Sequence, residues 1–319
     1  MPTFDCSIVI INWNTKDLLS RCLSSISVGA KKISYEIFVV DNGSSDGSQG
    51  MVQTSFPEVH LIANTENRGF GYANNQAFRK AQGRYFFCLN SDAYLSENSL
   101  DELVSYLDQH PSIGMAVPQL LCENGDSQPS LSVIPDLLYE LAGPSLRALF
   151  PQRYYGDKFK PKEPVSVQSL SGAAFLIRKA MADQIGIYDE DYFFYYEETD
   201  WCFRTKKAGW EIFFLPQIHV YHGRGKSTKS YKFEVRIEYW RSRYLFFKKN
   251  HSRWQYYGLR IGLLLRQAIP LPFNLFLGLF NPRIKQRAQT SYKILRWHWQ
   301  GCPEIVGLPG RRKSGLLIK

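Results

Sequence analysis

The sequence lacks several patterns that would assign its class directly. Its six cysteines form no Cys-x-x-Cys pair and no His/Cys cluster with zinc spacing, and this usage fits a reducing compartment such as the cytosol. We expect no secretory signal, because the first apolar stretch is short and follows Asp5. A dinucleotide fingerprint and a P-loop are both incomplete, since Asn74 and Val220 stand where those patterns need glycine.

Acidic residues are scarce in the last third of the chain. Residues 1–200 hold 15 Lys/Arg against 25 Asp/Glu, whereas residues 201–319 hold 24 against 4. The overall charge of +10 therefore joins an acidic part to a strongly basic one, which indicates that the basic part contacts something anionic. With 319 residues, 44% hydrophobic and 15% aromatic, the composition is globular and excludes a disordered chain.

Apolar runs alternate with helical periodicities along the first half of the sequence. We predict strands at 6–13, 36–40, 59–63, 84–89 and 113–117, and helices at 15–26, from about 46, at 71–82, at 97–109 and at 201–208. Thr15 is the expected side-chain cap of the first helix. Such β-α units predict an α/β fold with a mainly parallel sheet covered by helices on both faces. We expect a long irregular connection at 123–164, strand-like structure at 165–178 and helices from about 233 to 299.

Polar clusters follow four of the predicted strands, at the sheet edge where open parallel sheets bind ligands. They are Asn12/Asn14, Asp41-Asn42, the stretch from Asn64 to Asn75, and Asn90-Ser91-Asp92. A single strand-end Asp is more often a turn former or a helix cap. Four clusters in order, one for each strand, indicate a ligand site.

Two of these clusters suit parts of a nucleotide. The Asp41 carboxylate could accept the N3–H of uracil or thymine, or it could only shape the turn that follows. Asn67, Arg68 and Gly69 lead into a predicted helix, and a glycine, an arginine and a helix N-terminus together favour an anion such as a diphosphate. The alternative is a glycine-rich loop with an incidental arginine.

Asp92 suits a divalent cation beside a diphosphate. Mg²⁺ and Mn²⁺ prefer oxygen ligands and substrate phosphates, although a lone strand-end Asp also caps helices. His222 is a candidate second ligand, and Arg224 and Lys226 are candidate phosphate partners. A lone histidine is more often structural than a ligand.

An acidic run surrounds five consecutive aromatic residues at 192–196. Aromatic side chains around a carboxylate raise its pKa towards the range of a general base. Glu198 or one of its neighbours could therefore take a proton from a hydroxyl group. Alternatively, part of the run is the acidic start of the helix through Arg204.

Taken in order, these motifs resemble family 2 glycosyltransferases, in particular bacterial rhamnosyltransferase-like and galactofuranosyltransferase-like members. The matching stretches lie within residues 6–230 and are 7–14, 39–47, 67–71, 89–92, 171–173, 196–200 and His222. The resemblance implies a GT-A fold, a UDP- or dTDP-sugar donor and a Mg²⁺ or Mn²⁺ cofactor. It also implies inverting transfer of a sugar, with rhamnose preferred, to a glycan or lipid-linked acceptor in cell-surface polysaccharide synthesis.

The resemblance also assigns roles to single residues. Asp41 would hold the base, Asp92 and His222 the metal, and Glu198 would be the catalytic base. The remaining donor-site residues would be Asn12, Asn14, Asn67, Arg68, Gly69, Ser91, Ser171, Gly172, Arg224 and Lys226. The metal motif is Asn-Ser-Asp and supplies one carboxylate. Glu198 replaces the usual Asp of the base motif, which leaves the choice among Glu197, Glu198 and Asp200 open.

The basic region predicts a second unit at 231–319, after a catalytic domain at 1–230. Its apolar stretch 259–280 is interrupted by two arginines and two prolines, so a membrane-spanning helix is not expected. We expect an interfacial helix at the cytoplasmic face of the inner membrane. The alternative is an interface in a homo-oligomer.

Three other functions compete with a glycosyltransferase. A nucleic-acid-binding protein would spread basic residues over its reading surface, yet the part that carries the motifs is acidic, so no nucleic acid is expected. A non-catalytic nucleotide-sugar-binding subunit would fit the departures from the motifs. A sugar nucleotidyltransferase would need a glycine-rich basic loop after the first strand, where Asn12-Trp13-Asn14 stands.

Overall fold

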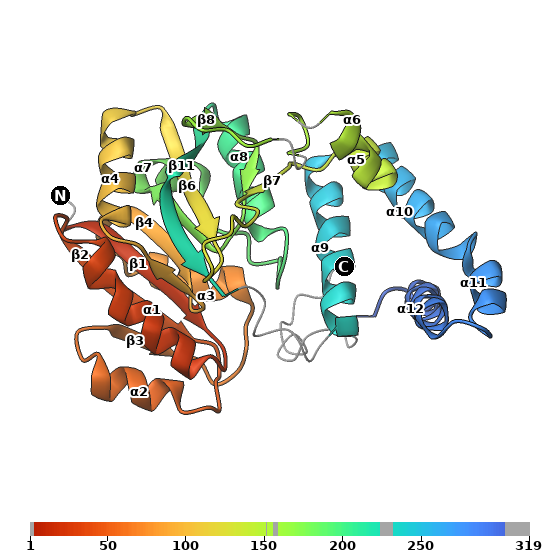
Figure 1. Cartoon of the computed structure of the whole chain (residues 1–319), viewed down its shortest axis with the longest axis horizontal. Helices are drawn as coiled ribbons and strands as arrows, with labels where there is room; N and C mark the ends of the chain where they lie inside the picture. Colours follow the sequence, from red (N-terminus) through yellow and green to blue (C-terminus); the bar gives the residue numbers. More distant parts are fainter. Residues whose placement is uncertain (1–2, 151, 156–158, 224–231, 304–319) are drawn as a thin grey trace.

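The computed structural model describes residues 3–150, 152–155, 159–223 and 232–303. Figure 1 shows an α/β body, built around one twisted sheet, with a layer of helices beside it. Within the described residues the main sheet has nine strands in the order β3-β2-β1-β4-β10-β6-β11-β5, with β8 paired to β11. The strands are β1 (Phe4–Asn12), β2 (Tyr35–Asp41), β3 (His60–Ala63), β4 (Gly83–Asn90), β5 (Ala93–Leu95), β6 (Ile113–Leu121), β8 (Val165–Ser166), β10 (Ala174–Arg178) and β11 (Glu211–His222).

The predicted mainly parallel sheet is confirmed. β1 pairs in parallel with β2 and with β4, β2 pairs in parallel with β3, and β6 pairs in parallel with β11. β10 runs antiparallel between β4 and β6, and β5 and β8 pair antiparallel with β11. A separate small ribbon pairs β7 (Leu131–Ser132) with β9 (Ser169–Leu170). The carboxyl ends of β1, β2 and β4 therefore meet at one edge, as the order of polar clusters predicts.

Helices cover both faces of the sheet because its central strands are apolar on both sides. Ile8, Val9 and Ile10 of β1 are all buried, and alternate residues enter two different core clusters. One cluster takes side chains from α1 (Lys16–Gly29), α2 (Ser48–Ser55) and α4 (Ser99–Gln109). The other takes them from α3 (Phe70–Phe78), α7 (Lys179–Ile185) and α8 (Glu197–Lys207).

Several predicted elements need correction. Thr15 precedes α1 without capping it, because its hydroxyl donates to Asn12 Oδ1 at 2.7 Å and meets Ser91 Oγ at 2.8 Å. The helix predicted at 201–208 begins at Glu197. The irregular connection predicted at 123–164 contains two helices, α5 (Leu137–Ala142) and α6 (Pro144–Leu149). The pattern at 211–222 gave no strand prediction, although the twelve residues of β11 lie there.

The predicted helical region is confirmed as four helices. They are α9 (Lys232–Asn250), α10 (Arg253–Ala268), α11 (Leu271–Leu277) and α12 (Pro282–Trp299), and the break between α10 and α11 falls at Pro270. No described helix is long and apolar enough to cross a membrane. A third core cluster joins this layer to Tyr192 and Tyr196 of the α/β body. α5 packs on α10, so part of the predicted first domain lies in the helical layer.

Candidate active site

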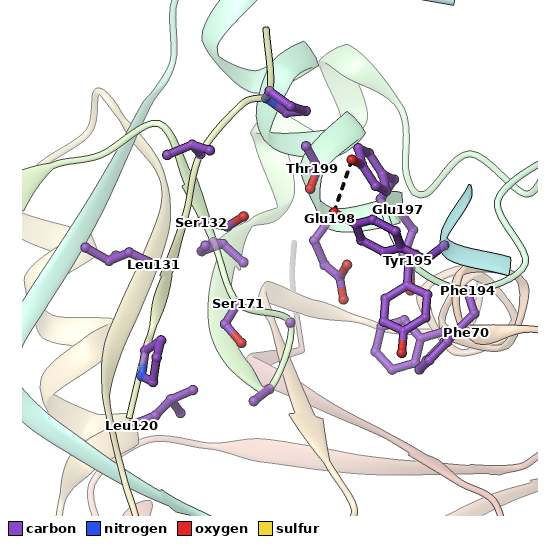
Figure 2. A pocket seen from close by; sticks show the side chains of 18 of the residues that line it. Phe70, Leu120, Leu131, Ser132, Ser171, Phe194, Tyr195, Glu197, Glu198 and Thr199 are labelled. Carbon is purple, nitrogen blue, oxygen red and sulfur yellow. Dashed lines mark hydrogen bonds between the residues drawn. The ribbon is translucent and has the colours of Figure 1, made fainter. Parts of the chain in front are cut away.

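A cavity of about 460 Å³ lies between the sheet edge and the helical layer. Its lining includes Ser171, Gly172, Glu198 and His222, all of which the sequence singles out. The lining also includes Tyr139 and Glu140 of α5 and Tyr239 of α9, which the sequence does not single out, and Tyr195 of the predicted aromatic run. Figure 2 shows part of this lining. The cavity therefore combines predicted site residues with residues supplied by the helical layer.

Glu198 is the second residue of α8, and its carboxylate points into the cavity (Figure 2). Burial removes water from around the Glu198 carboxylate, and this desolvation raises the pKa of Glu198 from 4.5 to about 7. A carboxylate with such a pKa holds and releases a proton near neutrality. Its position and its pKa both suit a general base.

Gly172 allows this position of Glu198. A Cβ built on Gly172 would collide with the Glu198 carboxylate, so the missing side chain leaves the space that the carboxylate occupies. The segment is held on both sides by its backbone, since Ser171 N–H donates to the Ser130 carbonyl and Asn90 N–H to the Ala173 carbonyl, each at 2.9 Å. The predicted Ser171-Gly172 motif thus lies against the candidate base.

Glu197 lines the same cavity but is more deeply buried, with 2% of its surface exposed. Burial, and then the charge of Glu198, raise the pKa of Glu197 well above its usual value. Its Oε2 has no hydrogen-bond partner within the part of the chain that the structure describes. A protonated Glu197 beside an ionisable Glu198 is the arrangement that this environment favours.

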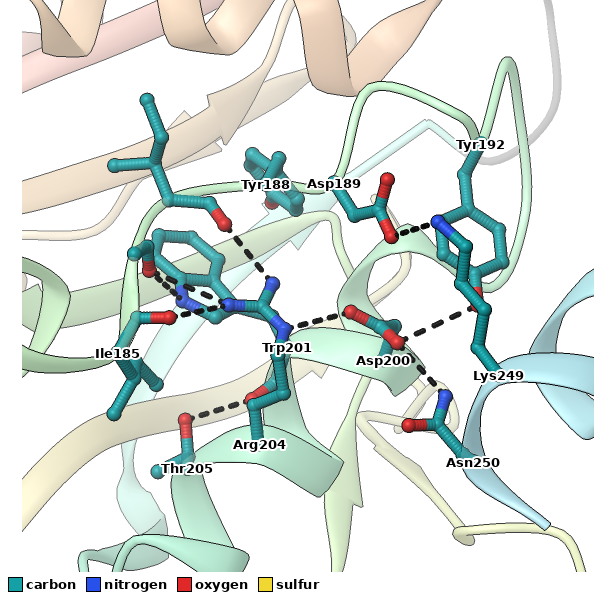
Figure 3. A network of polar contacts seen from close by, with 12 residues as sticks. Ile185, Tyr188, Asp189, Tyr192, Asp200, Trp201, Arg204, Thr205, Lys249 and Asn250 are labelled. Carbon is teal, nitrogen blue, oxygen red and sulfur yellow. Dashed lines mark hydrogen bonds and ion pairs between the residues drawn. The ribbon is translucent and has the colours of Figure 1, made fainter.

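Asp200 lies in a different place. Its oxygens accept hydrogen bonds from Arg204 Nε at 2.8 Å, Asn250 Nδ2 at 2.9 Å and the Tyr192 hydroxyl at 3.4 Å (Figure 3). It is not among the described residues that line the cavity. Because Asn250 belongs to α9, this buried carboxylate links α8 to the helical layer. Of the three candidate acids, Glu198 alone combines access to the cavity with a pKa near neutrality.

Two strained tyrosines lead the chain into α8. Tyr195 and Tyr196 both have positive φ angles, of 69° and 68°, which non-glycine residues rarely adopt. Tyr196 is held there by its hydroxyl, which donates to Glu140 at 2.8 Å, and Glu140 pairs with Arg243 of α9 at 2.9 Å. Consecutive left-handed residues are costly, and surrounding contacts must hold them in place. Here those contacts fix the start of the helix that carries Glu198.

Asp92 and His222, the predicted metal ligands, lie together. β5 pairs with β11 so that His222 is opposite Ala93, and this brings His222 Nε2 to 3.2 Å from Asp92 Oδ1. Gln128 contacts His222 on the other ring nitrogen: Gln128 Oε1 lies 3.1 Å from His222 Nδ1. Gln128 Nε2 also donates to the His222 carbonyl at 2.6 Å. Gln128 was not predicted, because it lies in a segment read as irregular and belongs to no spaced motif.

The chemistry of this pair fits a divalent cation. One carboxylate and one imidazole are acceptable ligands, and a Mg²⁺ or Mn²⁺ ion in such sites takes further oxygens from substrate phosphates and water. No group of three or more His, Cys, Asp or Glu with metal-binding geometry occurs among the described residues. Among the residues that the structure describes, this pair would offer a cation two ligands, and water or a diphosphate would have to supply the others.

At the end of β2, Asp41 is fully buried. It accepts hydrogen bonds from Asn12 Nδ2 at 2.7 Å, Gln49 Nε2 at 2.8 Å and Ser44 N–H at 2.9 Å. These bonds organise the turn after β2, and recognition of a base by Asp41 stays a prediction. Asn14 is exposed, with φ of 54°, and accepts from Ser45 N–H at 2.8 Å.

The loop before α3 joins the predicted donor site to the aromatic run. Asn67 Oδ1 accepts from Gly69 N–H at 3.0 Å, and Gly69 has φ of 91°. A Cβ on Gly69 would lie 2.6 Å from the Phe193 carbonyl oxygen, so only glycine fits there. Arg68 is exposed and stacks on Tyr72, 3.9 Å from the ring centre. Arg224 and Lys226 lie outside the described residues.

With this geometry in place, comparison with known families is decisive. Residues 7–186 match the sequence model of glycosyl transferase family 2. The chain belongs to that family. Open α/β sheets bind ligands at the carboxyl ends of their strands, and Asn90, the last residue of β4, lines the cavity around Glu198.

Individual relatives support the assignment. The N-acetylglucosaminyl-diphospho-decaprenol L-rhamnosyltransferase of Mycobacterium tuberculosis is 27% identical over 263 residues, which cover 77% of this chain and 85% of the relative. The low-salt glycan biosynthesis hexosyltransferase Agl10 of Haloferax volcanii is 25% identical, with 81% of each chain covered.

Solved structures identify the fold as GT-A. The mannosyltransferase PcManGT of Pyrobaculum calidifontis, in complex with GDP-Man and Mn²⁺, superposes with a TM-score of 0.54 at 16% identity, over 93% of this chain and 89% of that one. GalNAc-T7 with UDP, GalNAc and Mn²⁺ superposes with a TM-score of 0.55 at 17% identity. The aligned part covers 75% of this chain and 47% of that one. The predicted fold class is confirmed.

Proposed function

We propose that this family 2 glycosyltransferase transfers a sugar, with inversion, from a pyrimidine nucleoside-diphosphate sugar to an acceptor hydroxyl group. The observation that carries the proposal is Glu198. Its carboxylate, with a pKa of about 7, shares a cavity with His222, which lies 3.2 Å from Asp92. The proposed base thus shares its cavity with one of the two proposed metal ligands.

In the proposed reaction Glu198 acts as the general base. It takes the proton of the acceptor hydroxyl while that oxygen attacks the anomeric carbon from the face opposite the diphosphate. A new carbon–oxygen bond forms as the bond to the diphosphate breaks, and the proton stays on Glu198. The acceptor would rest against the aromatic residues Tyr139, Tyr195 and Tyr239, which line the same cavity as Glu198.

Asp92 and His222 would hold the divalent cation through a carboxylate oxygen and Nε2. Such an ion, when bound, neutralises charge on the departing diphosphate. Gln128 orients the imidazole through Nδ1, so that Nε2 stays directed at Asp92. Imidazole is a more usual ligand for transition metals than for Mg²⁺, which favours Mn²⁺.

The donor and acceptor classes are proposed from the relatives. The mycobacterial relative is named as a rhamnosyltransferase acting on a decaprenol-linked sugar diphosphate. By analogy we propose dTDP-rhamnose as donor and a lipid-linked glycan as acceptor in cell-surface polysaccharide synthesis. Asp41 would face the base, through exchange of one of its present partners, with Asn12 and Asn67 shaping that part of the site.

A panel of UDP- and dTDP-sugars, tested with Mg²⁺, Mn²⁺ or EDTA, examines this proposal. We expect release of nucleoside diphosphate from one pyrimidine donor with a divalent metal present, and an inverted anomeric configuration of the product by NMR. Retention of configuration, or full activity in EDTA, would contradict the mechanism. Donor binding with neither transfer nor hydrolysis would instead support a non-catalytic nucleotide-sugar-binding subunit.

A further inference from the structure

The helical layer exposes a set of large apolar side chains on α10, on α11 and just after it, which we call the α10–α11 face. It consists of Tyr257, Ile261, Leu265, Phe273, Phe276 and Phe280, each between 50% and 78% exposed. The three residues on α10 are spaced by four, so they lie along one side of that helix. α11 follows directly and has no buried residue. Figure 1 shows α10 and α11 at the side of the molecule away from the sheet.

The other side of α10 already has its packing partners. Leu259 and Leu263 are buried in the core cluster of the helical layer. Gly258 and Gly262 are the points at which Leu137 and Leu141 of α5 come close to α10. The exposed stripe is therefore a second apolar surface on a helix whose inward side is occupied. A monomeric protein rarely exposes a large apolar patch unless the patch binds something.

The charges around this face select the kind of partner. Residues 239–303 contain 12 Lys/Arg and no Asp/Glu. Arg253 and Arg266 lie near the two ends of α10, and Arg283 at the start of α12, and all three are exposed. A second copy of the chain placed on the same face would bring these cations towards one another. An apolar stripe on helices whose only charged residues are cations is instead typical of helices that lie in the interface of an anionic bilayer.

We propose that the α10–α11 face binds the surface of a membrane that contains anionic phospholipids. The rings of Phe273 and Phe276 enter the headgroup region, and the neighbouring arginines contact lipid phosphates. Because α10 packs on α5, and α5 supplies Tyr139 and Glu140 to the cavity, this binding places the α5 part of the cavity lining near the membrane. That consequence for a lipid-linked acceptor rests on the proposed function, whereas membrane binding itself does not.

Vesicle co-sedimentation of the full-length protein, without substrates, tests the proposal. We expect binding to vesicles of equal parts phosphatidylglycerol and phosphatidylcholine, little binding to pure phosphatidylcholine, and weaker binding as salt screens the charges. The double variant Phe273→Ser/Phe276→Ser should bind at least about ten-fold more weakly, because two phenyl rings lose their apolar environment. Val28→Ser, which removes an exposed apolar residue of α1, is the matched control and should bind like the wild type.

The outcomes separate this proposal from the enzymatic one. Equal binding of the double variant and the wild type, or equal binding to both vesicle types, would overturn it. A wild-type dimer that ignores vesicles and dissociates in the double variant would show that a second copy covers the face. Release of nucleoside diphosphate with a water-soluble acceptor should be unchanged in the double variant, so a failed membrane proposal leaves the proposed function intact.

Discussion

The carboxylate of Glu198 occupies the space in which a side chain on Gly172 would lie. The two residues come from different segments, since Glu198 is the second residue of α8 and Gly172 precedes β10. Their contact joins the helix with the candidate base to the edge of the sheet. The position of the candidate base therefore depends on a glycine, which has no side chain that could take part in the reaction.

Gly172→Ala should therefore reduce transfer without unfolding the protein. The added methyl group has to displace the Glu198 carboxylate, and a misplaced catalytic group costs about 10²-fold in rate. The measurement is kcat of transfer together with the denaturation midpoint. Gly50→Ala is the control, because a Cβ on Gly50 of α2 meets nothing within 4 Å. A Gly172→Ala enzyme with normal kcat would show that the close contact does not position the base.

Asp92→Ala should weaken donor binding only when a divalent metal is present. Loss of the one carboxylate of the pair should raise the Kd of the donor at least about ten-fold in Mn²⁺ and leave it unchanged in EDTA. His222→Ala should act in the same direction, measured by calorimetry. His219→Ala, which removes an exposed histidine from the same strand, should have no effect. Equal wild-type affinity in Mn²⁺ and in EDTA would contradict the metal site.

Asp200→Ala should lower stability more than catalysis. Removing this carboxylate leaves Arg204 without its buried partner and breaks the bond to Asn250, which should cost about 3 kcal/mol. Urea denaturation measures the loss, and kcat per folded molecule should stay close to that of the wild type. Asp183→Ala, which breaks the exposed pair with Lys179 four residues away, should cost less than about 0.5 kcal/mol. A large loss of kcat in folded Asp200→Ala would return Asp200 to the list of candidate bases.

The raised pKa of Glu198 predicts opposite pH effects on activity and stability. A general base works when deprotonated, so kcat/KM should rise as pH increases through about 7. The folded state keeps the proton up to that pH, whereas the unfolded chain loses it near 4.5, so folding becomes less favourable between the two values.

Glu198→Gln should consequently be more stable than the wild type at pH 8, by on the order of 1 kcal/mol, and equal to it below pH 4.5. Urea denaturation at several pH values measures this difference. Equal stabilities at pH 8 would show that Glu198 titrates in the folded protein at its ordinary value.

Local patterns predicted the α/β fold well. The strands β1, β2 and β4 are apolar runs buried on both faces, and such runs are visible in a single sequence. The strand β11 was missed because polar and proline residues interrupt its alternation, and its place between β6 and β5 depends on pairing far along the chain. α5 is short, and its packing on α10 comes from residues more than a hundred positions away.

The sequence identified only those residues of the candidate site that lie in local motifs. Asp92 and Glu198 lie in motifs, and β5–β11 pairing explains why His222 joins Asp92. Gln128, Tyr139 and Tyr239 also line the cavity, but tertiary contacts bring them there and no motif in the sequence marks them. Nor could the sequence separate Glu198 from Asp200, because the difference lies in their partners: Asp200 faces Arg204 and Glu198 faces the cavity.

The turnover of Glu198→Gln at pH 8 tests the central claim most directly. Glutamine keeps the shape of the side chain and cannot accept the proton, so kcat should fall by about 10²- to 10⁴-fold while the donor Kd stays close to the wild-type value. Glu102→Gln, at an exposed position on α4, controls for the loss of one charge. Near-normal turnover of Glu198→Gln would contradict the assignment of Glu198 as the base.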